Sequence, residues 1–392
     1  MRAKVHSMSA PLSGPHLPPP EREPVDLLII AGEHSGDEHA ARLVREARAQ
    51  QPGLVVAALG GPQLAGAGAQ LLHDLTSSSV VGIVEVLQNF SFFRALFAEI
   101  IRWIETHRPR AVCLVDYPGL NLRLAQALRE RGLSVKGGGA IKLLYYISPQ
   151  IWAWKAGRRF TMARDLDAMA VIFPFEVGCY HDTQLPVEFV GHPFLAPDYA
   201  RPVRYDPAGP ILLLPGSRKQ AVSRIFPVLR AGFAAYARTN PGARAIVLYP
   251  SEAILAVLQA GAPPPSVTLQ RMGPPVAASA VLTSSGTMSM HCALAGIPGA
   301  IAYRANTLTY VMGRMLVKIE YLGIANLLLD APMYPEYIQG AATPSALAAE
   351  LERCTHDQTR QKTTAEQAAL LRAKLNVAAG SSASDWLIRQ LA

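Results

Sequence analysis

Short runs of consecutive apolar residues recur along the chain, and several of them end in glycine or another turn-forming residue. Such runs are typical of strands buried on both faces of a parallel sheet, and helical apolar patterns lie between them. We therefore expect strands at residues 25–31, 54–59, 111–115, 142–147, 168–173 and 188–190 in the first half, and at 211–214, 245–249, 278–283 and 299–303 in the second.

The alternation of strands and helices stops near residues 198–206 and restarts at Pro210. Two successive series of this kind predict an α/β protein with two doubly wound, Rossmann-like domains facing a central cleft. The expected divisions are a disordered, proline-rich extension at 1–24, a first domain at 25–200, a second at 205–362, and C-terminal helices at 363–392 that could pack back on the first domain.

Composition and charge narrow the class of protein. The chain has 392 residues, of which 50% are hydrophobic and 17% charged, so a disordered protein is excluded. Its formal net charge of +8 favours an anionic partner, and because the arginines form no dense run, we expect a phosphorylated small molecule or a membrane surface rather than nucleic acid. The four cysteines lie far apart and predict reduced thiols in the cytosol.

Two long segments could be mistaken for targeting or membrane sequences. The first 24 residues lack an apolar stretch, which argues against a signal peptide. Residues 272–303 contain no Asp, Glu, Lys or Arg, but prolines and glycines divide them into short pieces. We interpret that segment as buried α/β structure rather than a membrane span.

Polar and glycine-rich turns follow several predicted strands. Ligands bind at the carboxyl ends of strands in open parallel sheets, so these turns are candidate sites. The turn at 32–37 carries Glu33 and offers backbone N–H groups to an anion, although Asp37 as a helix N-cap explains it equally well. Asp116 could act as a general base or serve as an ordinary loop cap.

The second half offers two turns that suit a diphosphate. Pro215-Gly216-Ser217-Arg218 and Ser284-Ser285-Gly286-Thr287 each open a helix after a strand, with backbone amides and hydroxyls. The first also carries the guanidinium of Arg218, which binds phosphate oxygens in a fork. Ordinary helix caps would explain each turn separately, but not the arginine.

Two apolar segments allow a choice between core and surface. Residues 80–104 hold more apolar and aromatic side chains than one core-facing stripe needs, which suits either an interfacial membrane helix or a helix buried between layers. The segment Ser148–Lys155 carries Trp152 and Trp154, for which we favour core packing over stacking on a sugar face.

Several motifs, taken together and in order, resemble one family, the lipid-A-disaccharide synthases, which are GT-B glycosyltransferases. The most specific of them is Ser-Pro-Gln-Ile-Trp-Ala-Trp at 148–154. The resemblance covers roughly residues 25–390 and includes the segments at 31–37, 60–62, 82–87, 173–176, 189–193, 215–218, 285–287, 303–304, 316–318, 326–327 and 335–336.

The resemblance implies an inverting transfer with no metal or redox cofactor. The donor would be UDP-2,3-diacylglucosamine and the acceptor 2,3-diacylglucosamine 1-phosphate (lipid X), giving the β-1,6 lipid A disaccharide 1-phosphate and UDP. The first domain would then be the acceptor and membrane-facing domain, and the second would bind the nucleotide sugar. Peripheral association with the cytoplasmic side of the inner membrane is implied, and members often dimerise, so a homodimer is an expectation here.

Site residues are carried over by position. Asp116 matches the proposed general base, and Glu33 matches an acidic position of functional importance. The expected donor-binding residues are Ser217, Arg218, Gly273, Ser285, Gly286, Thr287, His291 and Asn326. The expected membrane contacts are Val84, Val86, Leu87, Phe90, Phe92, Phe93 and Phe97.

The chain departs from the family pattern at several positions. His291 stands where a glutamate is usual, and a neutral imidazole accepts one hydrogen bond where a carboxylate accepts two or more. Ala221 and Gly119 each replace an acidic residue, and Ala325 replaces a proline. Two further functions therefore stay open: a weakly active paralogue that binds UDP-sugar or lipid without turnover, and a sugar-nucleotide epimerase of the same fold.

Overall fold

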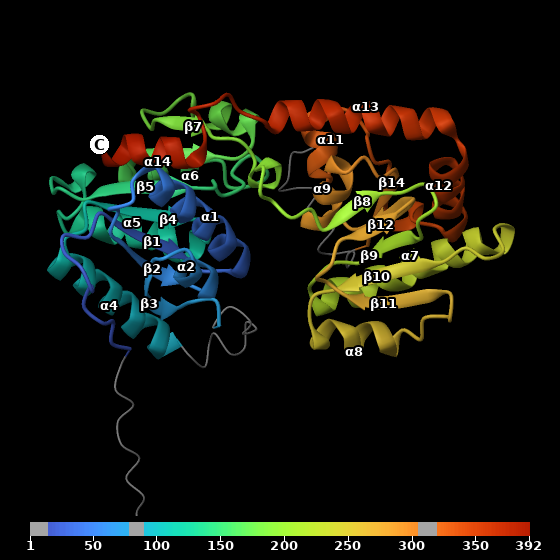
Figure 1. Ribbon diagram of the computed structural model, residues 1–392, viewed down its shortest axis with the longest axis horizontal. Helices are drawn as coiled ribbons and strands as arrows, with labels where there is room; N and C mark the ends of the chain where they lie inside the picture. Colours follow the sequence, from blue (N-terminus) through green and yellow to red (C-terminus); the bar gives the residue numbers. More distant parts are fainter. Residues whose placement is uncertain (1–14, 78–89, 305–319) are drawn as a thin grey trace, which may run out of the picture. The chain divides into compact units, whose positions relative to one another are not determined.

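The structure is a computed structural model that describes residues 15–77, 90–304 and 320–392 (Figure 1). The chain forms two compact units. Unit 1 is built from the described part of Met1–Ile172 together with Glu176–Gly191 and Val377–Ala392, and unit 2 from Phe173–Phe175 and the described part of His192–Asn376. Each unit is an α/β structure around a parallel sheet, which confirms the predicted fold class.

The sheet of unit 1 has seven strands in the order β3-β2-β1-β4-β5-β6-β7, all parallel. Its central strands are buried along their whole length, as their apolar runs predict. The strands are β1 (Leu27–Ala31), β2 (Val56–Gly60), β3 (Gln70–Asp74), β4 (Ala111–Val115), β5 (Lys142–Tyr146), β6 (Ala168–Val171) and β7 (Val187–Phe189).

Helices on both sides complete unit 1. They are α1 (His34–Gln50), α2 (Pro62–Gly66), α4 (Phe90–His107), α5 (Pro118–Glu130), α6 (Arg158–Asp165) and α14 (Ala383–Leu391), with short 3-10 turns η1 (Val135–Gly137) and η2 (Pro174–Tyr180). Helix α14 ends the chain but packs against α1, which begins shortly after the first strand (Figure 1). Unit 1 therefore depends on residues from both ends of the sequence.

Unit 2 contains a six-stranded parallel sheet in the order β11-β10-β9-β13-β14-β15, and a separate parallel pair, β12 with β8. The strands are β8 (Val203–Tyr205), β9 (Ile211–Leu214), β10 (Ala245–Tyr249), β11 (Val267–Arg271), β12 (Val276–Ala278), β13 (Ala280–Thr283), β14 (Gly299–Tyr303) and β15 (Glu336–Ile338). The strands β3, β8, β11 and β15 were not predicted because polar residues interrupt them, and β12 was not predicted because it has only three residues.

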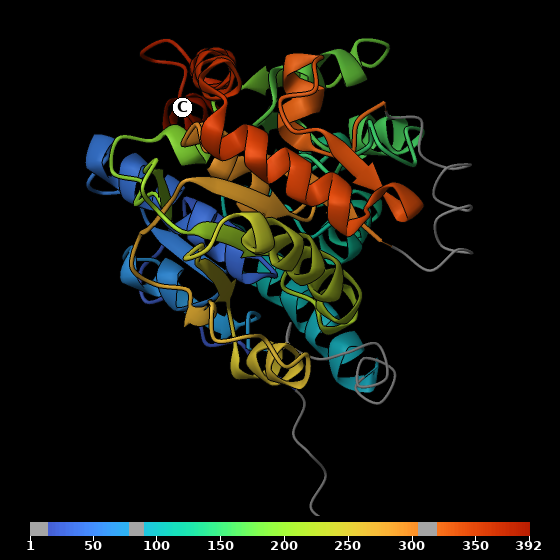
Figure 2. The same ribbon diagram turned by 90° about the vertical axis from the view of Figure 1, so that its right-hand side faces the viewer.

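The helices of unit 2 form two groups. Helices α7, α8 and α12 bury their apolar faces against one side of the sheet, and α9, α11 and α13 pack on one another (Figure 2). Their bounds are α7 (Lys219–Thr239), α8 (Glu252–Ala260), α9 (Thr287–Leu294), α11 (Ile324–Leu329), α12 (Pro344–His356) and α13 (Gln358–Leu375), with 3-10 turns η3 (Pro193–Leu195) and η4 (Gln339–Ala341).

The start of the described chain corrects one expectation. Residues 15–24 were assigned to a disordered extension, but Leu17 is buried and its N–H donates to Glu99 at 3.0 Å. The indole of Trp103 donates to the carbonyl of Pro18 at 2.8 Å. These proline-rich residues pack on α4 because it presents a carboxylate and an indole to their backbone.

The charge-free segment 272–303 contains β12, β13, α9 and β14 in the structure, which confirms its interpretation as α/β structure. In the three described ranges, no helix combines the length and the apolar content that a membrane crossing requires.

Candidate active site

Each sheet reverses its strand order at one point. In unit 1 the chain runs outward from β1 through β2 to β3 and then returns to β4 beside β1, and in unit 2 it does the same from β9 to β13. A crevice forms outside the carboxyl ends of the strands at such a reversal. The turns that follow β1, β4, β9 and β13 are the four candidate turns of the sequence.

Asp116 follows β4 in a strained backbone conformation. Its φ is 46° and that of Tyr117 is 45°, a left-handed region that residues other than glycine rarely occupy. The Asp116 carbonyl accepts hydrogen bonds from the Tyr145 hydroxyl at 2.5 Å and from Asn121 Nδ2 at 2.8 Å. The buried Asn121 also donates to the Val115 carbonyl at 3.2 Å, so it holds both sides of the turn.

The environment of Asp116 suits a proton acceptor. Burial and the negative charge of Glu33 raise its pKa to about 6, while a backbone hydrogen bond from Tyr117 opposes the rise. A carboxylate with this pKa is ionised at neutral pH and is a stronger base than an ordinary aspartate. Glu33 itself is exposed and precedes α1 as its N-cap residue.

In the turn that follows β1, position 32 has no room for a side chain larger than that of glycine. A Cβ added there would lie 2.1 Å from Cδ1 of Tyr117, so only glycine lets the two turns approach. The predicted capping role of Asp37 is wrong in one respect. It does not cap its own helix but accepts from the N–H groups of Gly61, Gln63 and Leu64 at the start of α2.

In unit 2 the two diphosphate turns lie side by side. The N–H of Ser284 donates to the Leu214 carbonyl at 2.9 Å, and a Cβ on Gly216 would lie 3.5 Å from Ser284 Oγ. Gly216 has a φ of 113°, which favours glycine, and the turn leaves Ser217 and Arg218 exposed at the start of α7.

Other expected donor residues lie at the same edge of the sheet. Gly286 is the N-cap residue of α9, with Ser285 before it and Thr287 opening the helix. Gly273 follows the carboxyl end of β11 and is exposed. Arg218, Ser217 and these residues thus gather where parallel strands end and helices begin, which is where anions bind.

His291 is held in a stack of rings. Its ring centroid lies 3.9 Å from that of Phe194 with 27° between the planes, and 5.6 Å from that of Tyr199 with 8° between them. The Tyr199 hydroxyl lies 3.3 Å from His291 Nε2. The acceptor atom expected for a ribose thus already has a partner within unit 2.

Asn326 also serves the fold itself. It is fully buried, its Oδ1 accepts from Tyr334 N–H at 2.9 Å, and its Nδ2 donates to the Tyr334 carbonyl at 2.7 Å and to Glu336 at 2.9 Å. Glu336 in turn accepts from the N–H groups of Leu322 and Gly323, both at 2.9 Å. Asn326 therefore braces the turn before α11, and its expected contact with the donor stays a prediction.

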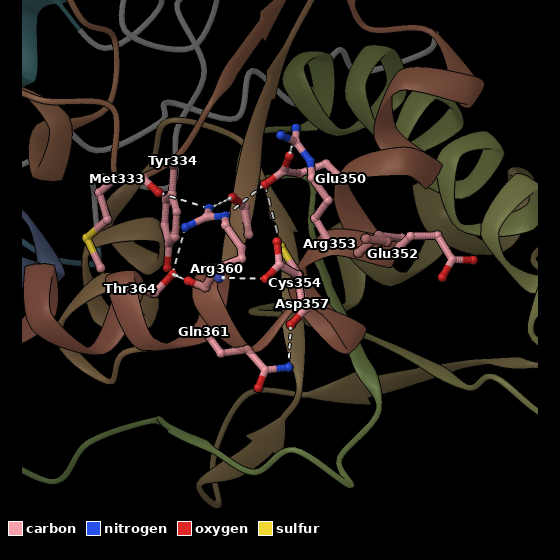
Figure 3. A network of polar contacts seen from close by, with 12 residues as sticks. Met333, Tyr334, Glu350, Glu352, Arg353, Cys354, Asp357, Arg360, Gln361 and Thr364 are labelled. Carbon is pink, nitrogen blue, oxygen red and sulfur yellow. Dashed lines mark hydrogen bonds and ion pairs between the residues drawn. The ribbon is translucent and has the colours of Figure 1, made fainter.

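A buried ion-pair network holds the segment next to Tyr334, the partner of Asn326. Glu350, with no exposed surface, accepts from Arg353 and from Arg360 Nε at 3.1 Å (Figure 3). Arg360 also donates to the Met333 and Gly299 carbonyls, both at 3.0 Å. Because the network fixes the residue before Tyr334, it steadies the clamp around Asn326.

The tryptophan segment follows β5 at the edge where Asp116 lies. The prediction of core packing is wrong for Trp154, which is 47% exposed. Lys155 Nζ lies 4.5 Å from its ring centroid and Arg158 Cζ 5.2 Å away. The side chain of Trp152 is half-buried.

The expected membrane contacts are only partly described. Val84, Val86 and Leu87 lie outside the described residues, as does the side chain of Phe90. Phe92 is 37% exposed and Phe93 half-buried at the start of α4. Phe97 is partly buried and packs against the core of unit 1.

The sequence analysis missed Asn121, Tyr145, Arg158 and Glu336. Asn121 and Tyr145 carry a usable signal, since Asn121 lies in the first turn of the helix after Asp116 and Tyr145 is the second-last residue of the neighbouring strand. Across the described ranges, His, Cys, Asp and Glu side chains form no group of three or more that could hold a metal ion.

Comparisons with known proteins agree with this geometry. A sequence model of the lipid-A-disaccharide synthetase family matches residues 27–387. A lipid-A-disaccharide synthase from Geobacter sulfurreducens is 36% identical over 365 residues, covering 89% of this chain and 92% of that protein. Lipid-A-disaccharide synthase 1 from Legionella pneumophila is 35% identical over 381 residues, covering 93% and 97%.

Solved structures share the fold at low identity. The glycosyltransferase of kitacinnamycin superposes with a TM-score of 0.59 at 16% identity, covering 94% of this chain and 99% of that one. A UDP-N-acetylglucosamine 2-epimerase from Listeria monocytogenes gives 0.57 at 11% identity, covering 93% and 94%. The fold is thus GT-B, and the family match over nearly the whole chain decides among its members. The chain belongs to the lipid-A-disaccharide synthase family, the glycosyltransferases of lipid A biosynthesis.

Proposed function

We propose that the protein transfers 2,3-diacylglucosamine from its UDP derivative to the 6-hydroxyl of 2,3-diacylglucosamine 1-phosphate, with inversion and release of UDP. One observation carries the proposal. The strained, high-pKa Asp116 stands at the strand-order reversal of one sheet, and the paired diphosphate turns stand at the equivalent reversal of the other. Unit 1 would bind the acceptor and unit 2 the donor.

Asp116 is the proposed base of the transfer. Its carboxylate accepts the proton of the attacking hydroxyl as that oxygen bonds to the anomeric carbon of the donor. The bonds from Tyr145 and Asn121 fix the Asp116 backbone, so the carboxylate needs no rearrangement before reaction. Glu33 supports the base by keeping its pKa high.

The donor site lies at the turns of unit 2. Negative charge grows on the UDP oxygens as the glycosidic bond breaks, and Arg218 with the backbone N–H groups at Ser217 and Gly286 stabilises it. The remaining proposed donor-site residues at this edge of the sheet are Gly273, Ser285 and Thr287. Asn326 and His291 contribute through the turns they hold, since their polar atoms already have partners.

A peripheral membrane surface at the start of α4 completes the proposal, with the enzyme on the cytoplasmic face of the inner membrane. Phe92 and Phe93 lie edge to face, with ring centroids 5.9 Å apart, and Phe92 reaches solvent. An exposed phenylalanine beside Arg94 suits insertion among lipid headgroups.

A weakly active paralogue is the second candidate, favoured by the engagement of His291 and by Gly119. A Cβ on Gly119 would meet no heavy atom, so the structure leaves room for the missing carboxylate but nothing in its place. This candidate binds the UDP-sugar without acceptor-dependent release of UDP.

The test compares Asp116→Asn with Arg218→Ala. Loss of a general base lowers kcat by roughly 10²–10⁴-fold, with UDP affinity unchanged. Arg218→Ala should weaken UDP binding instead. Purified protein is incubated with UDP-2,3-diacylglucosamine with and without the 1-phosphate acceptor, and released UDP is measured. UDP release that survives Asp116→Asn would disprove the assignment of the base, and donor binding without any release in the wild type would establish the paralogue.

A further inference from the structure

The loop between β5 and α6 presents an exposed aromatic side chain close to two cations. Trp154 is 47% exposed, and both Lys155 and Arg158 lie over its ring. Lys155 adopts a φ of 56°, a conformation that costs of order 1–3 kcal/mol for a residue other than glycine. The loop that holds these three side chains at the surface therefore contains a strained residue.

The two cations differ from their neighbours in having no carboxylate partner. Arg159 is bound by Asp182 at 2.6 and 2.7 Å, and Arg164 by Asp165 at 2.8 and 3.0 Å. In the part of the chain that the structure describes, neither Lys155 nor Arg158 forms an ion pair. Two uncompensated positive charges side by side repel one another and are ready for an anion.

The loop that carries this cluster leaves β5, the strand that ends beside the proposed base. Strand β5 pairs with β4, and the Asp116 N–H donates to the Tyr146 carbonyl at the end of β5. Tyr145, whose hydroxyl binds the Asp116 carbonyl, is influenced by Arg158: burial raises the pKa of Tyr145 well above its usual range, and the positive charge of Arg158 partly opposes that rise. The cations therefore belong to the loop that leaves β5 at the edge of the sheet where Asp116 lies.

We propose that Trp154, Lys155 and Arg158 form the subsite for the phosphomonoester of the acceptor sugar. Lys155 and Arg158 bind the phosphate oxygens with charge-assisted hydrogen bonds, and the indole of Trp154 packs against the apolar face of the sugar ring. The identity of the ligand rests on the proposed function; the anion preference rests on the cluster alone. Binding at one end of the sugar directs its hydroxyl toward Asp116.

An anionic lipid headgroup has the same chemistry as the acceptor phosphate. The location of the cluster favours the acceptor phosphate over a lipid headgroup, because the cluster belongs to the loop that leaves β5 beside the Asp116 turn. Vesicle binding is therefore measured in parallel with acceptor binding.

The experiment measures equilibrium binding of two ligands in neutral detergent micelles. They are 2,3-diacylglucosamine 1-phosphate and 2,3-diacylglucosamine, which lacks the phosphate. The variants are Lys155→Gln, Arg158→Gln and Trp154→Ala. The control is Lys136→Gln, which removes the same charge from an exposed position before β5 begins, at the opposite edge of the sheet. Thermal unfolding of each variant checks the fold.

We expect Lys155→Gln and Arg158→Gln each to weaken binding of the phosphorylated ligand roughly 10- to 100-fold. Binding of the unphosphorylated ligand and of UDP should stay unchanged. Trp154→Ala should weaken binding of both ligands alike, by several-fold. Lys136→Gln should change the binding of neither ligand. The proposal is overturned if the charge variants keep the full preference for phosphate or weaken both ligands equally. It is also overturned if they reduce only binding to phosphatidylglycerol vesicles.

Turnover separates this inference from the proposed function. If the wild type shows the phosphate preference and the charge variants lose it, the subsite stands, even where no UDP is released. Failure of the transfer assay therefore leaves the phosphate subsite to be judged by binding alone.

Discussion

At the residue scale, the proposed chemistry depends on the surroundings of the Asp116 carboxylate. Burial and Glu33 both disfavour the ionised form of Asp116, and its pKa of about 6 lies above the value in an unfolded chain. The ionised carboxylate therefore costs stability above about pH 6, and this cost disappears below the unfolded-state pKa. Two bonds to its carbonyl keep the residue in place despite that cost.

Replacement of Glu33 by glutamine tests this pKa. Protonated Asp116 cannot accept a proton, so kcat/KM for the acceptor should fall as pH drops through about 6. Loss of the Glu33 charge favours ionised Asp116, which moves this fall to lower pH, although burial still keeps the pKa raised. The pH profile of kcat/KM is the measurement. Glu38→Gln, at an exposed position of the same helix, should leave the profile in place, and an upward shift in Glu33→Gln would contradict the assignment.

At the element scale, α4 combines two surfaces in one helix. Its later turns bury Ile100, Trp103 and Ile104 in the core of unit 1. Its first turn exposes Phe92, and the excess of apolar residues in the sequence is thereby divided between core and surface. Neither of the two original interpretations holds for the whole helix.

Phe92→Ser with Phe93→Ser tests the surface part of α4. Each phenylalanine that enters the lipid contributes up to about 1.5–3 kcal/mol, so the pair should lower vesicle partitioning roughly tenfold or more. Co-sedimentation with anionic vesicles measures the effect. Leu370→Ser changes another exposed apolar residue, on α13, and should have no effect. Equal sedimentation of the double variant and the wild type would refute the membrane contact at this helix.

At the scale of the whole molecule, unit 1 is completed by the last residues of the chain. Trp386 and Leu387 of α14 are fully buried, and Lys142 Nζ donates to the Gln390 carbonyl at 2.7 Å. Gln50, the last residue of α1, donates to Ser384 and Asp385, both at 3.1 Å. The unit that carries Asp116 therefore needs helix α14 for its stability.

Trp386→Ala measures this dependence. Truncation of a fully buried tryptophan leaves a cavity and costs about 3–5 kcal/mol, so unit 1 should unfold at lower denaturant. Because the two units have separate cores, UDP binding to unit 2 should persist where the transition of unit 1 has shifted. Leu370→Ala, at a half-exposed position, should change the midpoint little. An unchanged denaturation curve for Trp386→Ala would show that α14 is dispensable.

The local sequence determined the central strands and the turns that follow them. Apolar runs such as 27–31, 111–115 and 211–214 are typical of strands buried on both faces of a parallel sheet, and glycine or polar residues follow them. The locations of Asp116, Arg218 and Gly286 followed from that rule. Edge strands such as β11 and β15 were missed because partly exposed strands carry no continuous apolar run.

Only the tertiary structure decided which of the candidate side chains already have partners within the fold. His291 has the residue type of a donor site, yet Tyr199, 92 positions away in the sequence, already contacts its Nε2. Asp37 of α1 accepts from the N–H groups at the start of α2 because β2 ends beside it. Hydrogen-bond partners and burial arise from packing between segments far apart in the chain, and a local pattern contains no information about them.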